Sequence, residues 1–147
     1  MKIITILLSS FLITSCFGGG YFQSEESKKI WKLLESNDFR FINFSGYGDN
    51  NWTRVCFLGP YNDQSEKALG FNWHISEHTD VLMSDAHNVI VFVTDNEVVE
   101  YIVHSRGKGD FWKLSGECYS RDSSTFIKDN ESGNRLNYVH KRPNQGH

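Results

Sequence analysis

Within residues 88–104, two apolar runs constrain the fold of this chain more than any other feature. The runs are Val89–Val93 and Val98–Val103, and they flank Asp95 and Asn96. Both of these residue types tolerate the left-handed backbone that a two-residue turn needs. The stretch therefore predicts a β-hairpin.

A two-residue turn also predicts the register of the hairpin. It pairs Phe92 with Val99 and Ile90 with Tyr101, so these four side chains share one wholly apolar face. The other face carries Glu100. We therefore expect the first face to be the core side.

A helix is predicted ahead of the hairpin. Ser24 can cap its first turn, and the two glutamates that follow suit the positive end of a helix. Ile30, Leu33 and Leu34 then recur at helical spacing. These signals predict a helix over residues 25–36.

The remaining elements are shorter. We expect a short helix over 62–69 and strands over residues 39–44, 52–58, 71–75, 111–119 and 124–128. The last stretch, residues 129–147, is polar and is expected to be a tail. Residues 24–128 then form a single domain of α+β class, with the N-terminal helix packed on an antiparallel sheet of about five to seven strands and one disulfide.

The first fifteen residues differ in character from the rest of the chain. Lys2 provides a positive charge, and only three hydroxyl-bearing residues interrupt the apolar stretch over residues 3–13. This length is typical of the core of a signal peptide and is too short to span a bilayer. We therefore expect residues 1–15 to be a signal peptide.

The end of this stretch, Ile13-Thr14-Ser15-Cys16, resembles the lipobox of bacterial lipoproteins. The resemblance implies cleavage by signal peptidase II before Cys16, whose thiol then receives diacylglycerol and whose new amino group is acylated. Acyl chains of this kind hold a protein on a membrane essentially permanently. Residues 16–23 would form the acylated cysteine and a Gly-rich tether. An ordinary signal peptide cut nearby is the alternative, and it also implies export.

The residue after Cys16 bears on the destination. Phe17 stands there, whereas an aspartate at this place retains enterobacterial lipoproteins in the inner membrane. The resemblance therefore favours the outer membrane of a bacterial envelope, with the domain in the periplasm. Membrane lipid, bound through acylated Cys16, would be the first partner.

The two other cysteines, Cys56 and Cys118, are expected to form a disulfide, because an exported chain with an even number of remaining cysteines usually pairs them. In the chain-entropy description, closing so long a loop is worth about 4 kcal/mol. A catalytic thiol is the alternative. It would need a neighbouring base, and neither cysteine lies beside a histidine in the sequence.

The segment "WHISEH" contains His74, Glu77 and His78 in the order of the inverted zincin motif. That chemistry needs both histidines on one face of a helix, with the glutamate close to a metal-bound water. The surrounding residues alternate with a period of two, which gives a helix poor support. The two histidines therefore remain weak metal candidates, and solvated surface histidines are the favoured interpretation.

The charges of the chain limit the classes of partner. The 15 basic and 18 acidic residues give a net charge of −3, and no basic cluster is present, so a nucleic-acid partner is not expected. Asp95, Glu97 and Glu100 either keep the hairpin soluble or form an acidic edge for a basic protein. Trp52 and Trp112 are either core residues or anchors of an interface, and the core is favoured in so small a domain.

No motif of the chain indicates catalysis or a cofactor, and neither a nucleophile elbow nor a phosphate loop is present. We expect a lipid-anchored protein-binding module, of the kind that immunity proteins and inhibitors represent, which neutralises a toxin or a cell-wall hydrolase. An accessory subunit of an envelope assembly or transport complex is the alternative. A small metal-dependent hydrolase that uses the "WHISEH" residues is the third reading.

Overall fold

The computed structural model describes residues 24–48 and 51–142. The expected signal peptide, Cys16 and the rest of the tether lie outside these residues, as do residues 143–147 of the expected tail. The helices and strands follow in the order α1 (Glu25–Glu35), β1 (Phe41–Asn43), β2 (Arg54–Leu58), α2 (Ser65–Leu69), β3 (His87–Val93), β4 (Val98–Ser105), β5 (Cys118–Ser120), β6 (Thr125–Lys128) and β7 (Tyr138–His140). Neither of these two helices is long and apolar enough to cross a membrane.

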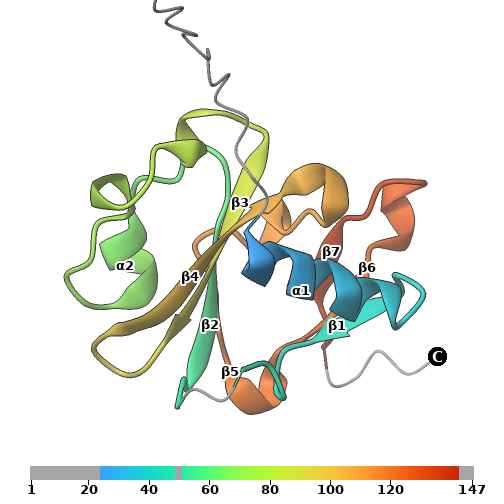
Figure 1. Cartoon of the computed structure of the whole chain (residues 1–147), viewed down its shortest axis with the longest axis horizontal. Helices are drawn as coiled ribbons and strands as arrows, with labels where there is room; N and C mark the ends of the chain where they lie inside the picture. The colour runs from blue at the N-terminus through green and yellow to red at the C-terminus, as the bar shows by residue number, and fades with distance from the viewer. Residues whose placement is uncertain (1–23, 49–50, 143–147) are drawn as a thin grey trace, which may run out of the picture.

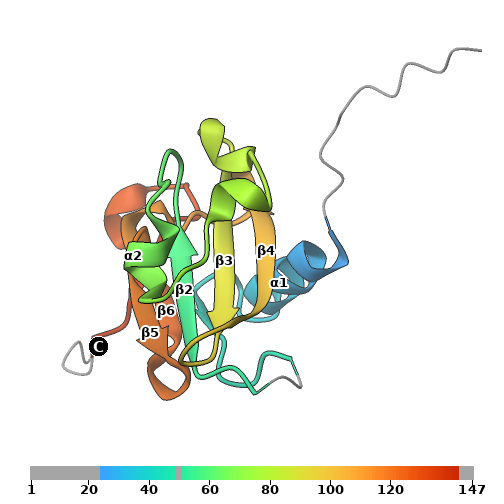
Figure 2. The ribbon, with the colours of Figure 1, turned by 90° about the vertical axis from the view of Figure 1, so that its left-hand side faces the viewer.

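The strands form two antiparallel sheets, which confirms the predicted α+β class. The larger sheet has the strand order β4-β3-β2-β5 and the smaller one β1-β6-β7. Figure 1 shows the larger sheet as a middle layer, with α1 and the smaller sheet on one side of it and α2 on the other. In Figure 2, α2 and the segment after it lie in front of the larger sheet. The predicted strands are thus divided between two layers.

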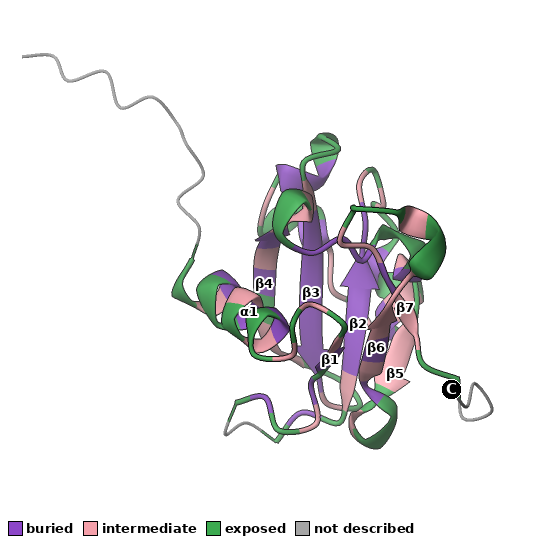
Figure 3. Cartoon of the chain, turned by 90° about the vertical axis from the view of Figure 1, so that its right-hand side faces the viewer, coloured by how far each residue is buried: buried purple, intermediate pink, exposed green. Residues whose placement is uncertain are grey.

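Apolar side chains cover both faces of the larger sheet. The core toward α1 and the smaller sheet includes Ile30, Leu34, Phe44, Phe57, Ile90, Phe92, Phe111 and Phe126. The core toward α2 includes Leu58, Leu69, Ile75, Val81, Val89, Val91 and Val93. Figure 3 shows β3 buried along nearly its whole length. A strand buried on both faces is apolar throughout, which explains the unbroken run that marks β3 in the sequence.

Helix α1 begins and ends close to the predicted residues. The Ser24 hydroxyl caps it by accepting a hydrogen bond of 3.1 Å from the backbone N–H of Ser27. Its buried side chains include Ile30 and Leu34, which pack into the first core. The spacing that predicted the helix is therefore the spacing of its buried face.

The hairpin turn lies where it was predicted, but the two strands pair in a different register. The N–H of Thr94 donates to the carbonyl of Glu97, and Val98 then pairs with Val93. A β-bulge follows at once, since the next pair joins Glu100 to Phe92. The extra residue exchanges the faces of all the β4 side chains beyond it.

This shift corrects two expectations. Tyr101 pairs with Val91 instead of Ile90, and its side chain lies on the face toward α2. Glu100 lies on the face toward α1. The expectation that only one face of the hairpin is a core face is therefore wrong, because each face of β3 contributes to one of the two cores.

The predicted disulfide between Cys56 and Cys118 is confirmed. The two residues lie directly opposite each other on β2 and β5, and their Cα atoms are 4.1 Å apart. The bond therefore joins a central strand of the larger sheet to a strand at its edge, across a separation of 62 residues in the chain.

Two of the predicted strands are wrong. Residues 71–75 form no strand, because the Ser65 hydroxyl holds this segment against α2: it donates to the carbonyl of Trp73 (2.8 Å) and accepts from the N–H of Ile75 (2.9 Å). The predicted strand over 111–119 begins only at Cys118, after a 3₁₀ turn over Trp112–Leu114.

The domain continues past its predicted end at Lys128. Strand β7 pairs with β6, and Tyr138 is fully buried, with its hydroxyl donating to the carbonyl of Phe39 at 3.0 Å. The expectation of a polar tail from residue 129 is therefore wrong for the part of it that the structure describes. A three-residue strand with one aromatic anchor leaves little signal in a polar stretch.

Candidate functional site

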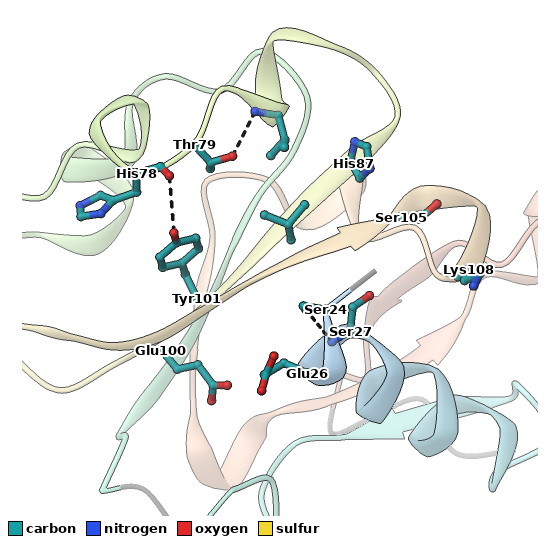
Figure 4. A pocket seen from close by; sticks show the side chains of 12 residues that line it. Ser24, Glu26, Ser27, His78, Thr79, His87, Glu100, Tyr101, Ser105 and Lys108 are labelled. Atoms are coloured by element: carbon teal, nitrogen blue, oxygen red, sulfur yellow. Dashed lines mark hydrogen bonds between the residues drawn. The ribbon is translucent and has the colours of Figure 1, made fainter. Parts of the chain in front are cut away.

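A groove of about 690 Å³ follows the outer side of β4, the end strand of the larger sheet. Figure 4 shows its lining side chains, which come from the start of α1, from β4 and the 3₁₀ turn after it, from the first residue of β3 and from the segment between α2 and β3. The lining residues are Ser24, Glu26, Ser27, His78, Thr79, Val81, His87, Glu100, Tyr101, Val103, Ser105 and Lys108. The groove therefore reaches both faces of the sheet at this edge.

The face of the groove toward α1 carries two facing carboxylates at one end, and Lys108 lines the other end, with its ammonium 5.8 Å from the ring centroid of Trp31. Glu26, in the first turn of α1, and Glu100, on β4, direct their carboxylates toward each other (Figure 4). Burial raises the pKa of Glu100, and the negative charge of Glu26 raises it further, whereas Lys29 lowers it. This face therefore has two like charges close together, and one of them is partly withdrawn from water.

The hydroxyl of Tyr47 responds to the same charges. Tyr47 is buried in the first core and stacks on Phe92 at 4.7 Å between ring centroids. Burial raises its pKa, and the charges of Glu100 and Glu26 raise it further.

The face of the groove toward α2 is aromatic. The rings of Trp73 and His78 stack with centroids 4.6 Å apart, and the ring of Tyr101 lies 5.9 and 5.8 Å from them. The Tyr101 hydroxyl donates to the carbonyl of His78 at 3.5 Å (Figure 4). Tyr101 is nevertheless 37% exposed, so this cluster presents aromatic surface beside the strand edge.

A buried polar contact holds the wall of the groove in place. The Ser27 hydroxyl lies 2.9 Å from Nδ1 of His104, and both side chains are fully buried. Burial lowers the pKa of His104 to about 4, although the backbone of Lys108 acts in the opposite direction. The imidazole is therefore neutral at neutral pH, and it joins α1 to β4. Sequence reasoning missed this contact, because its partners lie 77 residues apart.

The structure does not bring the candidate metal residues together. His74 faces Glu66 of α2, with Nε2 and Oε2 3.5 Å apart, whereas His78 stacks on Trp73. Glu77 is exposed on a 3₁₀ turn, where the zincin arrangement needs an α-helix. Among the described residues, no group of three or more His, Cys, Asp or Glu side chains could hold a metal ion.

The two tryptophans proposed as core or interface residues have different surroundings. Trp52 is buried, its indole N–H donates to the carbonyl of Tyr47 at 2.9 Å, and the guanidinium of Arg121 lies 4.5 Å from its ring. Trp112 is 47% exposed, so the expectation that it is a core residue is wrong. Of these two tryptophans, only Trp112 has a surface that a partner could contact.

The three acids predicted to form one acidic edge, Asp95, Glu97 and Glu100, do not lie together. Asp95 and Glu97 are exposed at the turn of the hairpin, whereas Glu100 lines the groove. Glu26, which sequence reasoning treated only as a favourable residue of the first helical turn, is the acid that Glu100 faces. Only the fold could reveal this pair, because the two residues are far apart in the chain.

A second, smaller hollow of about 290 Å³ lies beside the groove, and Thr79 lines both. Tyr61 and Met83 line it and are strongly exposed, at 67% and 78%. The backbone of Tyr61 is left-handed, with φ of 60°, and its N–H donates to the carbonyl of Leu82 at 2.7 Å. A bulky residue in this conformation is strained, and such strain is common at functional positions.

Comparison with known proteins gives no relative from which a function could be transferred. No family model, no curated protein sequence and no solved structure matches the chain. The functional interpretation therefore depends on the groove along β4 and on the charges within it.

Proposed function

We propose that this chain is a lipid-anchored protein of the bacterial envelope, and that its domain binds and neutralises a basic protein such as a toxin or a cell-wall hydrolase. The observation that carries the proposal is the facing pair Glu26 and Glu100 in the groove along β4. The anchor is acylated Cys16, the outer membrane is the favoured location, and the domain faces the periplasm.

The charge of the groove supports a basic partner. A lysine or arginine side chain placed between the carboxylates of Glu26 and Glu100 would relieve the repulsion that contributes to the raised pKa of Glu100. Complementary charges of this kind also accelerate association and select the partner. The pair therefore favours a protein that inserts a cationic side chain.

The surroundings of the groove support a protein surface as the ligand. The aromatic cluster of Trp73, His78 and Tyr101 lies on one side of the strand edge, and the hollow beside Tyr61 and Met83 adjoins it. Exposed aromatic and methionine side chains are enriched at protein interfaces. Together with the groove, they form one continuous surface of mixed charged and apolar character.

The burial of the Ser27 and His104 pair supports binding in preference to catalysis. A serine beside a histidine is a familiar nucleophilic arrangement, but here both side chains are fully buried. Ser27 lies against the groove but has no surface exposed to water. We assign the pair a structural role in positioning α1.

Affinity capture tests the proposal. The detergent-solubilised lipoprotein is used as bait in an envelope extract, and mass spectrometry identifies what it retains. We expect one stoichiometric basic toxin or hydrolase, which high salt releases. The double variant Glu26→Gln, Glu100→Gln should lose it.

A matched control removes two charges elsewhere. Asp95→Asn with Glu97→Gln neutralises the same number of carboxylates at the exposed hairpin turn, and it should retain the partner. Equal loss in both double variants would show that net charge, and not the groove, selects the partner. Recovery of a multi-subunit envelope complex would instead favour the accessory-subunit reading.

A further inference from the structure

Strand β4 has an edge whose backbone groups are available for pairing. The N–H of Arg106 donates to the carbonyl of Ala86, which continues the register that pairs His104 with Asn88. In an antiparallel ladder, alternate residues bond to the neighbouring strand, so the N–H and C=O groups of Tyr101 and Val103 point away from β3. No backbone hydrogen bond to these outward groups occurs within the described part of the chain.

The groove leaves space along this edge. Its lining includes β4 residues from Glu100 to Ser105, so the groove extends along the strand itself. The first turn of α1 bounds it on one face of the sheet, and the segment around His78 and Thr79 bounds it on the other (Figure 4). An extended polypeptide can lie along such a strand edge and form backbone hydrogen bonds with it.

The two faces of the groove require different side chains from that ligand. Successive side chains of a strand point to opposite faces of a sheet. On one face, the ligand would meet the carboxylates of Glu26 and Glu100, and on the other it would meet Tyr101, Val103 and Val81. A segment in which basic residues alternate with apolar residues satisfies both faces at once.

A second copy of this chain does not meet that requirement. If two β4 strands paired edge to edge, each would bring its own Glu100 into the groove of the other. Like charges on neighbouring strands are destabilising, and such charges are one way in which proteins prevent edge-to-edge association. The occupant is therefore a different protein.

We propose that β4 accepts an extended segment of the partner protein as an added strand, and that this segment alternates lysine or arginine with apolar residues. The proposal rests on the proposed function, because it describes how the neutralised protein is held. Backbone hydrogen bonds to Tyr101 and Val103 give the contact its direction and register. The carboxylates of Glu26 and Glu100 select its basic side chains.

A defined peptide tests the strand addition without knowledge of the partner. The probe is a capped hexapeptide that alternates lysine and valine, added to the detergent-solubilised lipoprotein. We expect it to slow hydrogen exchange at the amides of Tyr101 and Val103. We also expect it to bind about tenfold more tightly than the same peptide with glutamate in place of lysine. N-methylation of alternate peptide amides should abolish binding, and binding without protection of the two amides would overturn the proposal.

A backbone variant separates this inference from the proposed function. Val103→Pro removes an outward N–H and leaves the hydrogen bonds to β3 in place, since proline is tolerated at the open side of an edge strand. Its control is Val103→Thr, which keeps the N–H. Loss of the captured partner in the folded proline variant alone supports strand addition. If the proline variant still retains the partner, strand addition is wrong. The proposed function still stands in that case, provided that the double variant Glu26→Gln, Glu100→Gln loses the partner.

Two further outcomes are decisive. If the wild-type protein captures no basic partner, the proposed function is wrong, and strand addition is then judged by the peptide alone. If Val103→Pro does not fold, the N-methylated peptide makes the same comparison on the wild-type protein. In either case, strand addition is supported if the unmodified peptide slows hydrogen exchange at the amides of Tyr101 and Val103 and the N-methylated peptide does not.

Discussion

The hydroxyl of Ser27 on α1 lies 2.9 Å from Nδ1 of His104 on β4, and neither side chain is exposed to water. The contact joins the helix whose first turn carries Glu26 to the strand that carries Glu100. A neutral imidazole is required for it to persist, because a charged one would be buried without a compensating charge. The stability of the groove wall is therefore linked to pH.

The first prediction concerns this linkage. Burial lowers the pKa of His104 from 6.5 to about 4, so the unfolded chain binds the proton more readily than the folded one. The stabilisation is complete above pH 6.5 and is lost as the pH falls toward 4, with a total on the order of 3 kcal/mol. Urea unfolding over this range should show the loss. His104→Gln should flatten this part of the profile.

The second prediction concerns the disulfide. Removal of Cys56 and Cys118 together by alanine substitution should lower the free energy of unfolding by about 4 kcal/mol, because the bond closes a loop of 62 residues. Chemical denaturation of the wild type and the double variant measures the difference. In Cys56→Ala alone, the half-buried Cys118 should react with a thiol reagent after mild unfolding. Two free thiols in non-reducing peptide maps of the purified protein would contradict the pairing.

The third prediction concerns the strained backbone of Tyr61. Its φ of 60° is unfavourable for a bulky residue such as tyrosine, whereas glycine adopts it freely and asparagine tolerates it better than most residues that have a Cβ atom. Tyr61→Asn should raise the free energy of unfolding by about 1 kcal/mol, since the exposed ring contributes little to the core. Tyr61→Ala removes the ring but keeps the strain, so it should give no such gain. Equal stabilities of the asparagine and alanine variants would show that strain is not the cause.

The fourth prediction concerns the anchor, which lies outside the described residues. The resemblance of residues 13–16 to a lipobox predicts that labelled palmitate is incorporated into the wild-type protein and not into Cys16→Ala. The alanine variant should also leave the membrane fraction. Incorporation into both proteins, or into neither, would contradict the lipoprotein assignment.

Elements that depend on local signals were predictable from the sequence. The cap at Ser24 and the periodic apolar residues locate α1, and Asp95 and Asn96 locate the turn of the hairpin. The pairing of Cys56 with Cys118 was predicted from the two cysteines that remain once Cys16 is assigned to the lipobox, and the structure confirms it.

Features that depend on tertiary contacts were not predictable. The bulge at Val99 adds one residue without a local sequence signal, and it decides which face Glu100 and Tyr101 occupy. The alternating segment before Ile75 has the pattern of a strand, but hydrogen bonds to Ser65 hold it in another conformation. The facing pair Glu26 and Glu100 could not be predicted for the same reason, because only folding places α1 beside β4.

The two ends of the larger sheet differ in a way that limits how far an assembly can grow. Strand β5, at one end, is three residues long, and a disulfide fixes it to its neighbour, whereas β4, at the other end, is eight residues long. A sheet with two long open edges can polymerise, because each added strand presents a new edge to the next molecule. Within the larger sheet only β4 offers a long edge, and the carboxylates beside it disfavour a second copy. If β4 accepts a strand of the partner as proposed, we therefore expect this sheet to take up one guest strand.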